Sequence, residues 1–199
     1  LEVIGFYFSN HPLSLYPKNY FDQNNIVNYK DIIDNSEINN AKIVGSILDI
    51  KERSNKEGKK YAFLTISNEK TQFELSIFSN QLSEFRSLIK EGSVLIFHVD
   101  ISRDNENLRM IIRNIEDLDK VFSNEKFKIN LYLSGDNYIK SIDSLVTRSE
   151  QSKNDIFIYF NKNQKLISLN FSKNYEINNY ASLDQLNDLN KIDYSLEIL

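Results

Sequence analysis

Apolar and polar residues alternate along most of residues 41–118 with the period of two that is typical of β-strands. The alternation predicts three consecutive strands, in the stretches AKIVGSILDIKER, KKYAFLTIS and TQFELSIF. A short polar turn at residues 68–70 joins the second strand to the third, as in a hairpin. Gly45 lies inside the first stretch, where a glycine indicates a bulge or a sharp bend.

After the third strand the apolar spacing becomes helical in NQLSEFRSLIKEG, and Gly92 is the expected end of that helix. Two more alternating stretches follow, SVLIFHVDIS and NLRMIIRNIEDL. Three strands, a helix and two strands are the element order of a five-stranded OB-fold barrel. Such barrels bind oligonucleotides through the face of strands 2 and 3, through the loop between strands 1 and 2 (L12) and through the loop between strands 4 and 5 (L45).

The stretch from residue 123 to residue 199 predicts a small α+β domain. KFKINLYLS and DYSLEIL alternate like strands, and DIFIYF with KLISLNF forms a predicted hairpin. A capping box of Ser182 and Gln185 indicates the start of a helix. Another helix is predicted from a stripe made by Ile139, Ile142, Leu145 and Val146.

The first 40 residues are predicted to connect this region to something upstream. Pro12 lacks a backbone N–H and disfavours helical geometry at His11, so a helix begun near Leu1 must stop there. Residues 14–40 are polar and rich in Asn, as in a linker. The expected fold class is therefore mainly β plus α+β. It divides into a hinge or linker at 1–40, an OB-fold domain at 41–122 and an α+β module at 123–199.

Composition narrows the function classes. The chain has 24 basic and 28 acidic residues, so no global positive field announces a nucleic-acid partner. It contains no cysteine and two histidines far apart in sequence, which disfavours disulfides and a zinc site and fits a reducing, cytoplasmic compartment. No apolar stretch approaches the length of a membrane span. No residues suggest a catalytic or metal centre, so an independent enzyme is the least expected class.

The opening residues resemble a signature of the bacterial replicative DNA polymerase III alpha subunit, E-x-L-G-x-Y-x-S-G-H-P-L. The matching positions are Glu2, Ile4, Gly5, Tyr7, Ser9, His11, Pro12 and Leu13. Asn10 replaces the usual glycine of the signature, and Val99 stands where a glycine is common in the barrel.

In that family the signature precedes an OB domain and a short C-terminal module, so the resemblance implies a C-terminal fragment of a DNA-directed DNA polymerase. It further implies that the OB domain binds single-stranded template DNA and that the module binds the clamp-loader tau subunit. The sliding clamp and the catalytic magnesium would be bound by regions outside this chain. A free-standing OB-fold nucleic-acid-binding protein without a polymerase body remains the alternative.

Candidate DNA-binding residues cluster around the predicted L12 and L45 loops, because cations neutralise phosphates and aromatic rings stack on bases. The basic residues near L12 are Lys51, Arg53, Lys56, Lys59 and Lys60, followed by the aromatic pair Tyr61 and Phe63. Arg103 and Arg109 flank L45. Two other interpretations stay open, namely that the lysines form a solvated hairpin tip and that the strand aromatics belong to the core. Basic and acidic residues are equal in number over residues 41–120, so binding is expected to be weak and local.

Candidate partner-binding residues lie at the end of the chain, where an exposed apolar patch would indicate an interface. They are Tyr180, Leu196, Ile198 and Leu199. The alternative is that these side chains complete the core of the module itself.

Overall fold

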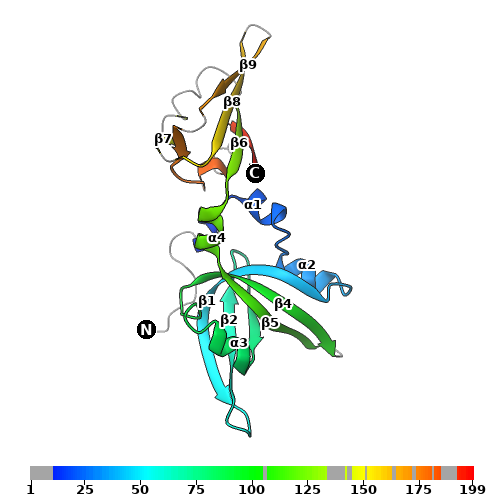
Figure 1. Cartoon of the computed structure of the whole chain (residues 1–199). Coiled ribbons are helices and arrows are strands. Elements are labelled where there is room, and N and C mark those ends of the chain that lie inside the picture. The colour runs from blue at the N-terminus through cyan, green and yellow to red at the C-terminus, as the bar shows by residue number, and fades with distance from the viewer. Residues whose placement is uncertain are drawn as a thin grey trace, which may run out of the picture. The chain divides into compact units, whose positions relative to one another are not determined.

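The computed structural model describes residues 11–104, 107–133, 142, 145–150, 152–162, 165–171, 174–180, 182–184 and 192–199. Their contacts divide the chain into two compact units. The barrel unit contains the residues up to 13 and residues 25–123, and the C-terminal unit contains residues 14–24 and 124–199 (Figure 1). Most of the opening signature lies outside the described residues.

Five strands of the barrel unit close into a barrel in the order β1-β2-β3-β5-β4, with β4 paired to β1. Neighbouring strands are antiparallel, except that β3 and β5 are parallel. This topology confirms the predicted OB fold. The strands are β1 (Asn40–Ser54), β2 (Lys60–Ser67), β3 (Gln72–Ile77), β4 (Val94–Asp104) and β5 (Asn107–Asp117).

Strand β1 belongs to both sides of the barrel. Residues 40–46 pair with β4 and residues 46–54 pair with β2. The register slips between Ile47 and Asp49, so the bulge lies there and not at Gly45. At Gly45 an added Cβ would lie 2.2 Å from Ile66 Cγ2 and 2.8 Å from the Ser67 carbonyl oxygen. The glycine is therefore required by close approach of the two strands at the corner.

Replacing Gly45 with alanine is expected to lower the free energy of unfolding of the barrel by about 3 kcal/mol, because a buried β-branched side chain and a backbone carbonyl must both move. Urea unfolding measures the loss. Gly58→Ala is the matched control, since a Cβ there meets nothing within 4 Å and only the φ of +76° opposes it. The control should lose about 1 kcal/mol. Equal losses in the two variants would contradict the close-approach explanation.

Helix α3 (Ser79–Glu84) follows β3, as predicted, but ends earlier than Gly92. Beyond it the Leu88 N–H bonds the Phe85 carbonyl in a turn. Gly92 has a φ of +83°, and its N–H donates to the Ile47 carbonyl at 2.8 Å. The chain leaves the helix early because residues 92–93 must reach β1 at the bulge.

The predicted linker contains helix α2 (Tyr29–Asp34), which closes one end of the barrel. Ile32 is fully buried in the barrel core, and the Tyr29 ring stacks on Phe73 with centroids 4.7 Å apart. Leu82 of α3 is buried in the same core. Because Phe73 is near the start of β3 and α3 follows its end, the two helices cover opposite ends of the barrel. Residues 25–39 are thus structural parts of this unit.

The C-terminal unit is built on a four-stranded sheet in the order β11-β6-β8-β9, in which only β6 and β8 are parallel. Two short strands, β7 and β10, pair beside it. The described strands are β6 (Phe127–Leu133), β7 (Val146–Arg148), β8 (Asp155–Lys162), β9 (Lys165–Asn170), β10 (Tyr175–Ile177) and β11 (Ile192–Ile198). The predicted strands and the β8–β9 hairpin are present.

The helical expectations for this unit are met only in part. Ile142 and Leu145 are helical and buried, whereas Val146 begins β7. Ile139 and Gln185 lie outside the described residues. Residues 182–184 are helical.

Three short helical segments complete the described chain. A 3-10 turn spans Pro12–Leu15, α1 spans Lys18–Gln23, and α4 spans Leu118–Asn124. The Lys120 N–H donates to the Asp117 side chain at 3.1 Å, which satisfies a free amide at the start of α4. None of the described helices has both the length and the apolar character needed to cross a membrane.

Candidate nucleic-acid interface

The two sides of β2 differ sharply in burial. Ala62, Leu64 and Ile66 are completely buried, so they point into the barrel. Tyr61 and Phe63 alternate with them and are only half-buried. They lie on the outer face, with ring centroids 5.6 Å apart in an edge-to-face arrangement at 81°. The interpretation of this pair as core residues is therefore wrong.

The strand register places a cation beside each of these rings. On β1, Lys51 is the partner of Phe63 and Arg53 is the partner of Tyr61. On β3, Ser76 is the partner of Phe63. Directly opposed residues in antiparallel strands have their side chains on the same face. The outer face of β1 and β2 thus alternates cationic and aromatic side chains.

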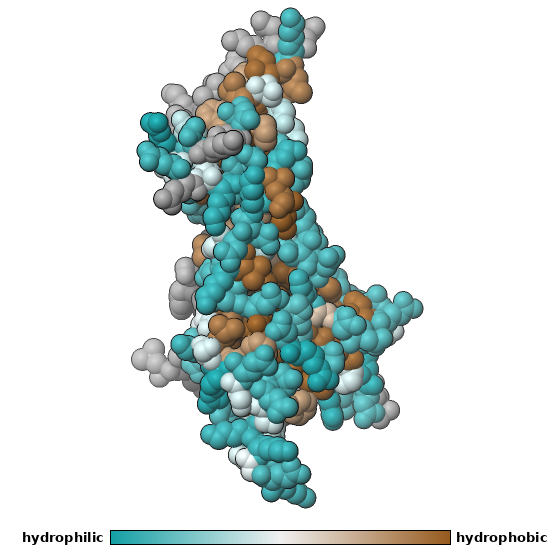
Figure 2. All heavy atoms as spheres, viewed as in Figure 1, coloured by the Kyte–Doolittle hydropathy of each residue, from teal (hydrophilic) through white to brown (hydrophobic). Residues whose placement is uncertain are grey.

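The β1–β2 arm, residues 51–60, extends this face (Figure 1). Its loop is confined to residues 55–59, because residue 54 already pairs with residue 60. The Asn55 side-chain oxygen accepts the N–H groups of Glu57 at 3.0 Å and Lys59 at 2.8 Å. Gly58 takes the left-handed φ that the turn needs. The tip is therefore an ordered turn with a hydrophilic surface (Figure 2).

All five basic side chains of the arm are exposed. Lys51 lies 3.3 Å from Asp49 and Lys59 lies 3.2 Å from Glu57. These pairs are exposed and contribute little, so a phosphate can replace either carboxylate. The remaining three side chains make no ion pair with any residue that the structure describes, namely Arg53, Lys56 and Lys60.

Phe78 is a candidate that the sequence interpretation missed. Its side chain is 49% exposed. It directly follows Ile77, the β3 partner of Ala62, so strand alternation places it on the outer face next to Tyr61. The signal was present in the sequence, because Phe73, Leu75 and Ile77 point inward and the following residue must point outward.

The two arginines near L45 have different roles. Arg109 is exposed on β5 and remains available. The Arg103 guanidinium instead donates to the carbonyls of Ile32 at 2.7 Å, Asn35 at 3.1 Å and Ile38 at 2.8 Å. Arg103 thus satisfies free carbonyls at the end of α2 and holds that helix on the barrel. Its expected DNA-binding role is corrected to a structural one.

His11 also has structural contacts. Its Nδ1 accepts the Leu13 N–H at 3.2 Å, and its Nε2 lies 3.0 Å from Ser67 Oγ. Burial lowers the pKa of His11 and outweighs the opposing effect of Glu69, so the neutral ring is favoured. The other histidine, His98, contacts Glu116. Among the described residues no three His, Cys, Asp or Glu side chains gather as metal ligands would.

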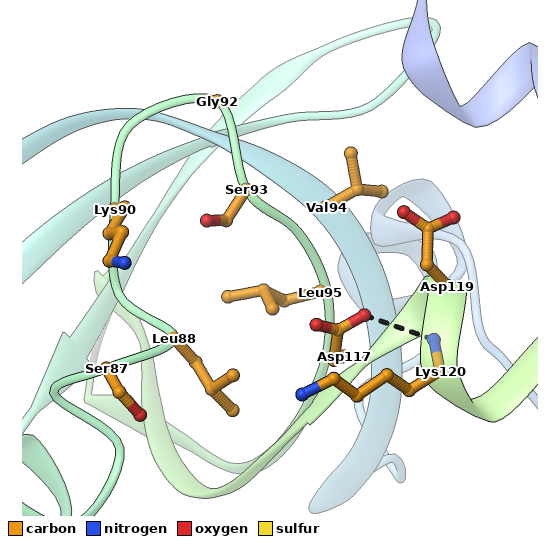
Figure 3. A pocket seen from close by; sticks show the side chains of 10 residues that line it. All are labelled: Ser87, Leu88, Lys90, Gly92, Ser93, Val94, Leu95, Asp117, Asp119 and Lys120. Atoms are coloured by element: carbon orange, nitrogen blue, oxygen red, sulfur yellow. Dashed lines mark hydrogen bonds between the residues drawn. The ribbon is translucent and has the colours of Figure 1, made fainter.

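A hollow of about 430 Å³ lies between the segment after α3 and the start of α4 (Figure 3). Lys90 and Lys120 face Asp117 and Asp119 across it, so it has no excess of either charge. No predicted DNA-binding residue lines it. It is therefore separate from the outer face of β1 and β2.

The candidate partner-binding residues are mostly internal. Leu196 is 1% exposed. The Tyr180 ring packs 5.8 Å from that of Phe127, its hydroxyl accepts from Asn154 Nδ2 at 2.8 Å, and burial raises its pKa to about 12. These two residues belong to the core of the unit, as the alternative held. Ile198 is half-buried, whereas Leu199 is 57% exposed.

Residues 41–118 match the family model of the OB-fold nucleic acid binding domain. The chain is also similar in sequence to DNA polymerase III alpha subunits. Those of Rickettsia bellii, Pasteurella multocida and Bacillus subtilis are 29%, 22% and 22% identical to it, over 82%, 80% and 84% of this chain. It spans only 14% to 15% of the length of these relatives.

Solved structures with partial likeness include two single-stranded DNA binding proteins. The mitochondrial protein of S. cerevisiae is 15% identical, with 39% of this chain and 90% of that chain covered and a TM-score of 0.34. The protein from Thermus aquaticus is 20% identical, with 40% of each chain covered and a TM-score of 0.35.

Proposed function

The chain is homologous to bacterial DNA polymerase III alpha subunits, and from this premise we propose that it is a C-terminal segment of such a subunit that binds single-stranded DNA through its barrel. The binding surface is the outer face of β1 and β2 together with the β1–β2 arm. Polymerisation would belong to parts of the subunit outside this chain.

The observation that carries the proposal is the pairing of a cation with each outward aromatic ring, Lys51 with Phe63 and Arg53 with Tyr61. Cations along a strand neutralise successive phosphates while aromatic rings stack on bases. Neither contact requires a particular base sequence, which suits a protein that follows a template. Phe78 and Arg109 extend the surface on β3 and β5.

An oligothymidine titration followed by fluorescence anisotropy tests the DNA proposal. At low salt we expect saturable binding that is tighter than for a duplex of equal length, because only unpaired bases can stack on the rings. The affinity should fall steeply as salt is added, since bound phosphates release counterions. Absence of binding at low salt, or a preference for the duplex, would overturn the proposal.

We further propose that the C-terminal unit binds the clamp-loader tau subunit through the exposed end of β11. Deleting residues 181–199 would remove a strand of the sheet, so a point change is the sharper test. Leu199→Asp is expected to weaken tau binding about tenfold by calorimetry, because it charges an exposed apolar contact. Ile33→Asp is the control, since Ile33 is 56% exposed in the barrel unit. Equal tau affinity in the wild type and Leu199→Asp would remove this assignment.

A further inference from the structure

The two faces of the C-terminal sheet differ in burial. On β6, Phe127, Ile129 and Leu131 are buried on one face. Tyr132 alternates with them and is 43% exposed on the opposite face. We call that opposite face the open face and define it by Tyr132, Phe157, Tyr159, Leu166 and Asp193.

The centre of the open face is aromatic. Tyr132 of β6 and Tyr159 of β8 are register partners, and their rings stack with centroids 5.1 Å apart and planes 16° from parallel. Phe157 lies two residues before Tyr159 on the same face and is half-buried. On β9, Leu166 is 66% exposed opposite Asn161. Figure 2 shows apolar surface gathered over the β8–β9 hairpin within a mostly hydrophilic exterior.

The charges on this face are mainly negative. Asp193 of β11 is the register partner of Tyr132, is exposed, and makes no ion pair with any described residue. The lysine on this face, Lys128, is 3.3 Å from Glu197. Asp155 is paired at 3.4 Å to Lys126. One lysine against three carboxylates disfavours a phosphate backbone, so the stacked rings are unsuited to a nucleic acid.

We propose that the open face binds a peptide segment of a partner protein. A large apolar or aromatic side chain of that segment covers the Tyr132–Tyr159 pair and Leu166, and an adjacent Lys or Arg pairs with Asp193. The exposed tyrosines supply contact area at low entropic cost, and the unpaired carboxylate supplies charge complementarity. This inference goes beyond the proposed function, because it defines the partner by its chemistry and uses neither the DNA-binding face nor Leu199.

A phage-displayed library of random peptides, panned on the intact chain, is the probe. We expect enrichment of peptides that carry an aromatic or large aliphatic residue next to Lys or Arg. Synthetic copies should bind Tyr132→Ser, Leu166→Ser and Asp193→Lys about tenfold more weakly than the wild type in anisotropy titrations. Leu166→Ser guards against misfolding, because that side chain is already mostly exposed. Glu150→Lys makes the same charge change at an exposed position of this unit and should bind normally.

Three results would overturn the inference. They are no enrichment above background, enriched peptides without basic residues, and equal affinities across the open-face variants. Loss of oligothymidine binding in Tyr132→Ser would also overturn it, since it would make this face a nucleic-acid surface. The tau and DNA experiments read different ligands and different residues, so their failure is distinguishable from failure here.

Discussion

Replacing Lys56, Lys59 and Lys60 together with glutamate is expected to weaken single-stranded DNA binding by about 10²-fold at low salt. Each lost phosphate contact on a single strand lowers the slope of log affinity against log salt by about 0.7, so three contacts remove about 2 from the slope. At about 50 mM salt that loss corresponds to two to three orders of magnitude in affinity. Anisotropy titrations across a salt series measure both quantities.

The fold of the arm should survive these changes. The turn depends on the Asn55 side chain and on backbone amides, not on the lysine side chains. A control with the same net charge change replaces Lys30, Lys90 and Lys120, which are exposed elsewhere on the barrel unit. If both triple variants lose affinity equally, the effect is one of net charge and the arm is not the binding site.

The barrel could be predicted because its elements announce themselves locally. The period of two along β2 and β3 separates Leu64 and Leu75, which are fully buried, from Phe63 and Glu74 on the outer face. That alternation also placed the cationic and aromatic residues of β1 and β2 near each other. Strand patterns and their order were sufficient for the OB topology and for most of the DNA-binding face.

The features that the sequence did not reveal depend on contacts between distant segments. Arg103 is flanked by polar residues like any loop arginine, and only the fold brings it to the carbonyls of Ile32 and Ile38. Gly45 looks like a bulge until the position of Ile66 is known. Leu196 lies near the chain end in a short alternating stretch, and its burial follows from its pairing with Ile129 of β6. Local patterns carry no information about such partners.

The predicted linker shows the same limit most clearly, because its halves serve different units. Residues 14–24 pack in the C-terminal unit. Tyr20 is completely buried there, with its ring 6.0 Å from that of Phe127 at 77°. The Gln23 side chain donates to the Leu196 carbonyl and accepts the Ile198 N–H at 3.2 Å, so it covers the free edge of β11 as a further strand would.

Tyr20→Ala is therefore expected to destabilise the C-terminal unit by about 3–5 kcal/mol, the usual loss for a large aromatic side chain removed from a core. Small domains have a total stability of about 5–15 kcal/mol, so the variant should populate unfolded forms of this unit. Hydrogen exchange should rise in β6 and β11 while β2 and β3 keep their protection. Leu15→Ala is the control, because Leu15 belongs to the same segment but is 60% exposed. Equal protection of β6 in Tyr20→Ala and the wild type would show that residues 14–24 are a linker after all.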